Sequence, residues 1–194
     1  MTKASDFEQV EVASEDELRD WLAAHHHQHQ SVWLISFKAG DDRYLAYDTI
    51  VRQLVAHGWV DSRPRSLDAA RSMRLISLRR PGSNWSRANR QRAEDLITSG
   101  QMTPRGQAAV DSARADGSWT ALVDIEDGVV PDDLAAMLRD TPHAQGHFDA
   151  FPPSSRRIIL EWIAAARTDA TRRKRVQQTA EMASRNERAN HYRS

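Results

Sequence analysis

The chain has 194 residues, with 27 basic and 27 acidic side chains and a formal net charge of zero at pH 7. It has no cysteine, which excludes disulfides, thiolate zinc sites, iron–sulfur clusters and a cysteine nucleophile. No apolar run reaches the roughly 18 residues of a membrane span, and the N-terminus lacks the apolar segment of a secretory signal. We therefore expect no membrane insertion and a cytoplasmic protein.

The neutral net charge conceals four charged segments. Residues 63–92 hold nine arginines against one acid, and residues 156–175 hold seven bases against two acids. Residues 116–140 carry seven acids against one base, and residues 1–20 carry seven acids against two bases. Such segments can pair with one another or face separate partners. We favour internal pairing and solvated faces for most of them.

The first predicted elements are a helix and a strand. Ser14 and Glu17 form a capping-box pattern at the start of a helix with an apolar stripe. Residues 31–38 follow as a strand that is apolar on both faces, so we expect a central strand covered on both sides. The loop residues Asp41 and Asp42 are predicted to be turn residues.

A second helix is predicted from Asp48, as its N-cap, to Gly58, as its stop. Residues 59–65 and 71–79 are rich in β-compatible side chains and predict two extended segments.

The next helix is predicted from about Ser86 to Ile97, after a turn at Pro81 and Gly82. Thr103 then caps a further helix that ends before Gly117.

Residues 124–133 are acidic and contain a glycine and a proline, which marks the best linker candidate. Everything after them has helical periodicity, including an apolar face made by Ile158, Ile159, Trp162, Ile163 and Ala166. The fold class predicted is α+β: a small mixed sheet with helices over residues 1–125, a helical unit over residues 130–185 and a frayed tail over residues 186–194.

Three strings are the most specific: HGWVD at 57–61, RRPGSNWSRANRQRAEDLI at 79–97 and RRIILEWIAAARTDATRRKRV at 156–176. In order along the chain, they resemble the YdeI/OmpD-associated family, also described as bacteriocin-protection proteins. The likeness extends from about Asp20 to Met182. Members often carry cysteine and phenylalanine where this chain has Ala56 and His57. The resemblance implies a bacterial protein tied to envelope stress or protection from toxic peptides, with no established reaction.

Residues 79–92 are the strongest candidate for binding, because five arginines surround one tryptophan without an acid. A helix N-terminus binds anions, yet arginines there oppose the helix dipole unless an anion is present. The alternative is that the arginines extend into solvent while the tryptophan packs on the core. The candidate ligand-binding residues are Arg79, Arg80, Ser83, Asn84, Trp85, Ser86 and Arg87, together with Trp59 and Asp61.

Asp61 can orient Arg63 or Arg79 through a bidentate pair, or act as a general base. Trp59 and Trp85 can stack on a ligand, although tryptophans in this context are more often core residues.

The histidines at 25–27 and 29 close the first helix, where they complement its dipole. We predict no metal site there and no cofactor. His57 is read as a helix C-terminal residue, and the basic run 171–175 as a solvated surface.

Three functions remain open. The first is a non-enzymatic stress or bacteriocin-protection protein that binds an anionic small molecule or an acidic protein. The second is an enzyme acting on a small anionic substrate, with Asp61 or His57 as base; it requires a pocket that brings Asp61 and Arg80 to one site. The third is a helical interaction module. Nucleic-acid binding is disfavoured by the neutral net charge, and the oligomeric state is left open.

Overall fold

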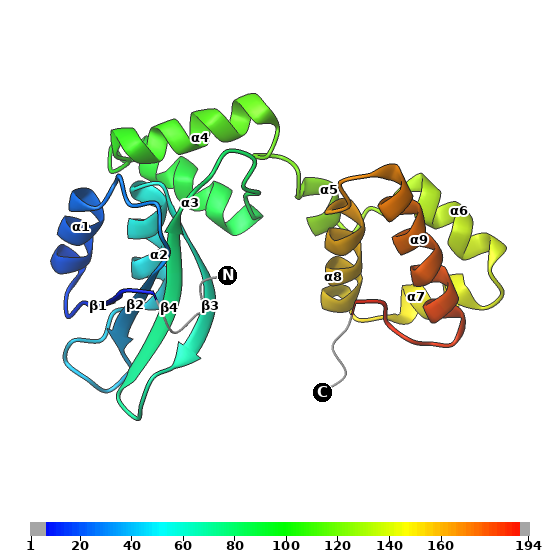
Figure 1. The fold of residues 1–194 in the computed structure, drawn as a ribbon, viewed down its shortest axis with the longest axis horizontal. Coiled ribbons are helices and arrows are strands. Elements are labelled where there is room, and N and C mark those ends of the chain that lie inside the picture. The colour runs from blue at the N-terminus through cyan, green and yellow to red at the C-terminus, as the bar shows by residue number, and fades with distance from the viewer. Residues whose placement is uncertain (1–6, 191–194) are drawn as a thin grey trace. The chain divides into compact units, whose positions relative to one another are not determined.

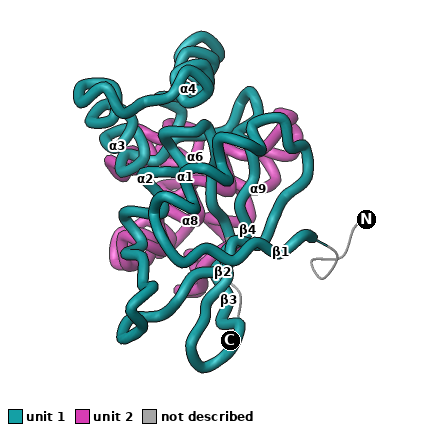
Figure 2. The backbone as a smooth tube through the Cα atoms, turned by 90° about the vertical axis from the view of Figure 1, so that its left-hand side faces the viewer, with its two compact units in different colours: residues 1–121 teal, residues 122–194 magenta. Residues whose placement is uncertain are grey.

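The computed structural model describes residues 7–190, apart from the side chain of Arg63. The chain divides into two compact units, Met1–Ala121 and Leu122–Ser194 (Figure 2). The first six residues of the predicted N-terminal segment and the last four of the predicted tail lie outside the described residues.

Unit 1 is built on a four-stranded mixed sheet (Figure 1). Its strands are β1 (Gln9–Glu11), β2 (Val32–Phe37), β3 (Trp59–Ser66) and β4 (Arg71–Leu78), in the spatial order β1-β2-β4-β3. β1 runs parallel to β2, whereas β2 with β4 and β3 with β4 are antiparallel.

Strand β2 is central and buried along its whole length, as its apolar sequence predicts. Val32 and Leu34 enter one core, beneath the helices α1 (Glu15–Ala24) and α2 (Tyr47–Ala56). Trp33 and Ile35 enter a second, smaller core with Met73 of β4. Because side chains alternate along a strand, these two cores lie on opposite faces of the sheet.

A side-chain cap begins α1 as the sequence predicts, but not α2. The Ser14 hydroxyl accepts the Glu17 N–H at 3.2 Å. Asp48, predicted as the N-cap of α2, lies inside the helix, which begins after Ala46 and has no side-chain cap. The prediction is wrong because the Asp48 carboxylate has another partner: it accepts Arg92 Nε and Nη2 at 2.9 and 2.7 Å.

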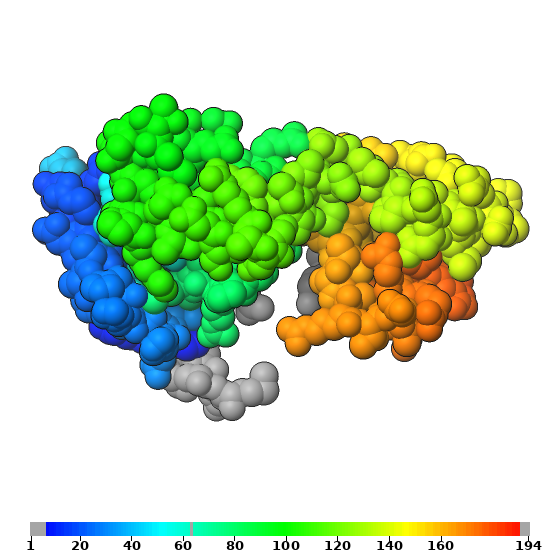
Figure 3. Space-filling view, turned by 90° about the horizontal axis from the view of Figure 1, so that it is seen from above, coloured from blue at the N-terminus to red at the C-terminus, as the bar shows by residue number. Residues whose placement is uncertain are grey.

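Helices α3 (Arg87–Thr98) and α4 (Pro104–Asp116) complete unit 1 by packing on α2. In Figure 3, α4 (green) lies at the surface of the unit beside the segment that includes α1 (blue). Thr103 caps α4 and also donates its hydroxyl to Ala56 O at 2.6 Å. Gly106 lies so close to the last residue of α2 that a Cβ atom added to it would be 2.2 Å from Ala56 O. The start of α4 is therefore held against the end of α2.

Unit 2 is helical, with α5 (Val123–Glu126), α6 (Asp132–Asp140), α7 (Ala144–Ala150), α8 (Pro153–Ala164) and α9 (Asp169–Ser184). Its core includes Leu134, Phe148, Ile159, Ile163 and Ala180.

Three details of unit 2 differ from the sequence patterns. The acidic segment read as a linker contains most of α5, whose Ile125 packs into the core. Ile158, placed on the buried face of α8, is 39% exposed, because that face is narrower than the apolar run. Ala189, inside the predicted frayed tail, is only 1% exposed.

These features confirm the predicted fold class: a small mixed sheet with helices, followed by a helical region. In the described part of the chain, no helix is long and apolar enough to cross a membrane.

Candidate anion-binding site

A tight turn follows β4 and carries the candidate arginines. Arg79 N–H donates to Gly58 O at 2.9 Å, which extends the pairing of β4 with the start of β3. Arg80 N–H donates to the Ser83 hydroxyl at 3.1 Å, and Ser83 N–H donates to Arg80 O at 3.0 Å. At the tip, Gly82 has a φ of +74° and donates its N–H to the Asp116 carboxylate at 2.7 Å. The turn is thus closed on itself and tied to the end of α4.

The Arg79 side chain is buried, with 7% of the residue exposed. Its guanidinium carbon lies 3.6 Å from the centroid of the Trp85 ring, a cation–π contact. Nη1 donates to Asn84 O over a long 3.4 Å. Nε and Nη2 are buried and have no hydrogen-bond acceptor among the described residues. A buried guanidinium of this kind is rare, because donors removed from water normally find acceptors.

Burial lowers the pKa of Arg79 to about 10, because the guanidinium has lost hydration that the charge of Asp61 offsets only in part. Asp61 is already engaged: it forms an ion pair with Arg74 at 3.2 Å and accepts the Tyr47 hydroxyl at 3.2 Å. The surroundings of Arg79 therefore disfavour its positive charge in the protein alone.

Two cavities adjoin this turn. The smaller, of about 110 Å³, is bounded by the turn, Trp85, Ser118 and one side of α4. The larger, of about 430 Å³, is bounded by the turn and by residues 26–29, which follow α1. Arg79, Arg80, Pro81 and Arg105 line both cavities. The two cavities are therefore neighbours in unit 1, and together they are called the hollow below.

Arg105 brings a third guanidinium to the cavities from the first turn of α4. Its backbone is fixed by the contact with Gly58, where an added Cβ would lie 3.0 Å from Arg105 O. Gly58 has a φ of +74°, which a residue with a side chain adopts only with strain. Among the described residues, the Arg80 and Arg105 side chains take part in no hydrogen bond or ion pair.

Asp116 is the acidic residue that lines the smaller cavity. Its Oδ1 accepts Ser118 N–H at 2.9 Å and its Oδ2 accepts Gly82 N–H at 2.7 Å. Hydrogen bonds from Ser118 and Gly82 lower the pKa of Asp116. The carboxylate thus holds the turn in place, and the cavity still has three cationic residues against this one acid.

The structure brings together four of the nine predicted site residues: Arg79, Arg80, Ser83 and Trp85 line the smaller cavity. Trp85 combines the two interpretations given to it, since it is 1% exposed and also forms part of the cavity wall.

The other predicted residues lie outside both cavities. Ser86 caps α3 by accepting Asn89 N–H at 3.3 Å, and Arg87 begins that helix. Asn84 contributes its backbone carbonyl to Arg79. Trp59 is fully buried against Trp21, with ring centroids 5.5 Å apart. Asp61 pairs with Arg74, not with Arg79, and the side chain of Arg63 lies outside the described part of the chain.

Arg105 is the residue that the sequence analysis missed. It is the second residue of α4, whose start Thr103 and Pro104 predict. The helix dipole makes this position unfavourable for a cation. That signal is the one used for Arg87, and it could have identified Arg105 as well.

The histidine cluster contributes to the larger cavity through His26, His27 and His29. His25 stacks on Trp21 with ring centroids 4.2 Å apart. In the described residues, no group of three or more potential ligands could hold a metal ion. His57 is buried, with Nδ1 2.9 Å from Gln53 O at the end of α2.

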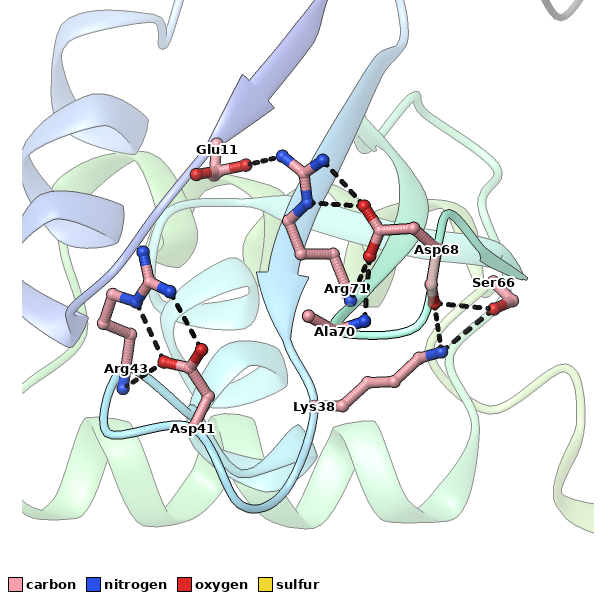
Figure 4. A network of polar contacts seen from close by, with 8 residues as sticks. All are labelled: Glu11, Lys38, Asp41, Arg43, Ser66, Asp68, Ala70 and Arg71. Atoms are coloured by element: carbon pink, nitrogen blue, oxygen red, sulfur yellow. Dashed lines mark hydrogen bonds and ion pairs between the residues drawn. The ribbon is translucent and has the colours of Figure 1, made fainter.

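A second polar cluster, at the opposite end of the strands, has its charges paired (Figure 4). Arg71 binds Asp68 at 2.7 Å and Glu11 at 2.5 Å. Asp41 accepts the backbone and side-chain N–H groups of Arg43, which confirms its predicted role in a turn. These charges neutralise one another, in contrast to those around Arg79.

Comparison with known proteins gives two matches over different parts of the chain. Residues 10–109 match a family model described as a domain of unknown function (DUF8412). Residues 127–186 match the model described as Bacteriocin-protection, YdeI or OmpD-Associated, which confirms the resemblance for the helical part of the chain and not for the whole span from Asp20 to Met182. Searches of curated proteins and of solved structures found no match. The chain therefore belongs to the DUF8412 family through residues 10–109 and carries a YdeI/OmpD-associated region at residues 127–186.

Proposed function

We propose that unit 1 binds an oxyanion, such as a phosphate or carboxylate group, in the hollow beside the turn after β4. The observation that carries the proposal is Arg79: a guanidinium 7% exposed, without acceptors for Nε and Nη2 among the described residues, in the wall of a cavity. A bound anion would supply the counter-charge that the protein does not provide.

The rest of the hollow has complementary chemistry. Arg80 and Arg105 add two cations, and guanidinium groups bind phosphate and carboxylate oxygens in a bidentate manner. A volume of about 110 Å³ is well below the roughly 300 Å³ of the smallest drug-sized pockets. The smaller cavity therefore suits a compact anionic group.

Binding without catalysis is the simpler reading of this hollow. The enzyme alternative required Asp61 and Arg80 at one site, but Asp61 lines neither cavity and is engaged by Arg74 and Tyr47. The match at residues 127–186 supports a role in bacteriocin protection or a related stress, which remains part of the proposal. In that role, unit 1 would sense or carry an anionic small molecule in the cytoplasm.

Thermal unfolding with increasing inorganic phosphate tests the proposal. A ligand that binds only the folded state stabilises it by about 2.7 kcal/mol at 100 times its dissociation constant. The wild-type chain should gain stability in this way, whereas Arg79→Met and Arg105→Met should not. Arg173→Met is the matched control, because Arg173 is exposed on α9 of unit 2.

Equal phosphate stabilisation of wild type and Arg79→Met would refute the proposal. Raising the concentration of sodium chloride separates a defined site from a nucleic-acid surface. Neutralising about four phosphates would weaken DNA binding roughly tenfold for each doubling of salt. If the chain binds duplex DNA with an affinity that falls this steeply with salt, and phosphate does not stabilise it, the nucleic-acid alternative is favoured.

A further inference from the structure

The larger cavity shares Arg79, Arg80, Pro81 and Arg105 with the smaller one. Its wall combines Arg79, Arg80 and Arg105 with the segment that follows α1, His26 to His29. No acidic residue lines this cavity within the described part of the chain. Three segments distant in sequence therefore place arginines and histidines around one volume of about 430 Å³.

We propose that the hollow accommodates a small molecule with two neighbouring anionic groups, of the diphosphate type. One group would occupy the smaller cavity, and the second would lie between Arg105 and the His26–His29 segment. This inference rests on the proposed function and specifies its ligand class.

The two cavities differ in a way that suits such a ligand. The smaller has room for a single compact group, whereas the larger falls within the size range of ordinary small-molecule pockets. The shared residues Arg79, Arg80 and Arg105 adjoin both volumes, so they can neutralise two adjacent charges at once. A ligand with one anionic group would leave part of this positive charge uncompensated.

The histidine segment supplies donors for the second group. His26 Nδ1 lies 2.6 Å from Ala23 O, so His26 helps to shape the turn that follows α1. The ring nitrogens of His27 and His29 form no hydrogen bond with other described residues. A neutral imidazole carries one N–H donor, and a protonated one carries two. His27 and His29 are therefore the residues expected to distinguish a diphosphate from a phosphate.

Isothermal titration of the full chain with inorganic phosphate and with pyrophosphate, without divalent cations, tests the inference. Wild type should bind pyrophosphate at least about tenfold more tightly, the equivalent of 1.4 kcal/mol. The double variant His27→Ala/His29→Ala should lose most of this advantage and keep the phosphate affinity of wild type. Gln30→Ala, an exposed neighbour outside both cavities, is the matched control and should behave as wild type.

The outcomes separate the inference from the proposed function. If phosphate and pyrophosphate bind wild type equally, the inference is wrong while the anion site stands. An advantage for pyrophosphate that survives in His27→Ala/His29→Ala would also overturn it, since the second group would lie elsewhere. If neither ligand binds, the proposed function itself fails. Circular dichroism of each variant without ligand checks that a loss of binding is not a loss of fold.

Discussion

Arg79 of unit 1 differs from the paired arginines of unit 2 in what compensates its charge. In unit 2, Arg172 binds Asp133 through Nε and Nη2 at 2.7 and 2.9 Å, and Arg157 binds Glu161 at 2.8 Å. Arg175 donates to the Trp162 carbonyl. In unit 1, Arg79 is buried with two nitrogens lacking an acceptor among the described residues. Arg172 and Arg175 thus connect helices of unit 2, and Arg157 binds Glu161 within α8. Nε and Nη2 of Arg79 have no such partner among the described residues.

The contrast also appears in the pKa directions. The hydrogen bonds to Asp133 raise the pKa of Arg172, because they stabilise its charged form. Burial lowers the pKa of Arg79 to about 10. Arg79 and Arg172 lie in the two basic segments of the sequence, but they differ in what compensates their charge.

The largest expected effect separates the units. Phe148 is fully buried in the core of unit 2, and truncating a buried phenylalanine typically costs about 3–5 kcal/mol. Phe148→Ala should therefore unfold unit 2 at a much lower denaturant concentration. If the anion site belongs to unit 1 alone, phosphate should still stabilise unit 1 of this variant. The fluorescence of the buried tryptophans of unit 1 follows this stabilisation. Loss of phosphate binding would show that the site depends on unit 2.

Gly106→Ala should act within unit 1. The added Cβ would lie 2.2 Å from Ala56 O, a backbone atom that cannot rotate away. Overpacking of this kind costs about 1–3 kcal/mol, and it should also displace Arg105 from the cavities. We expect a lower unfolding midpoint together with weaker phosphate binding. Gly146→Ala is the control, because a Cβ at Gly146 meets nothing within 4 Å. Unchanged stability in Gly106→Ala would contradict the tight contact between α2 and α4.

Substituting the two contrasting arginines should shift stability in opposite directions. Arg79→Met removes a poorly compensated buried charge and keeps an apolar side chain against Trp85. We expect a gain of about 1 kcal/mol in the ligand-free protein, since replacing buried ionic groups by apolar ones is often stabilising by 1–4 kcal/mol. Arg172→Met should instead lose a few tenths to about 1 kcal/mol, the usual range for an exposed pair. Urea unfolding measures both. A loss of stability in Arg79→Met would mean that its contacts with Trp85 and Asn84 O outweigh the cost of burial.

The sequence predicted the regular elements well where one local signal dominates. Ser14, Ser86 and Thr103 cap helices as expected, and the two-sided apolar pattern of residues 32–37 located the central strand. It misplaced the start of α2, because an aspartate that looks like a cap can serve a distant arginine instead. Local patterns carry no information about such long-range pairing.

The candidate site was predicted in part for the same reason. The sequence identified Arg79, Arg80, Ser83 and Trp85, which are close together along the chain. It could not place Arg105 or the histidines beside them, because their proximity depends on how α1, β4 and α4 pack. It also could not show that Arg79 is buried and Asp61 is engaged elsewhere. Burial, and not the number of arginines, is what distinguishes the site.

The smallest expected effect is the pH dependence of the Asp133–Arg172 pair. The hydrogen bonds from Arg172 lower the pKa of Asp133 below its ordinary value. A carboxyl group whose pKa is lower in the folded state binds its proton more readily when unfolded. Its contribution to stability is therefore complete above the unfolded pKa of about 3.9, and it is lost as the pH falls through the folded value. Because Asp133 is 44% exposed, solvent screens the pair and the contribution at pH 7 should be only about 0.5 kcal/mol. Asp133→Asn should be less stable than wild type by this amount at pH 7, and the two should converge near pH 2. If the stability difference between Asp133→Asn and wild type stays constant between pH 7 and pH 2, the Asp133–Arg172 ion pair does not stabilise unit 2. The arginines of unit 2 would then be less fully compensated than their geometry indicates.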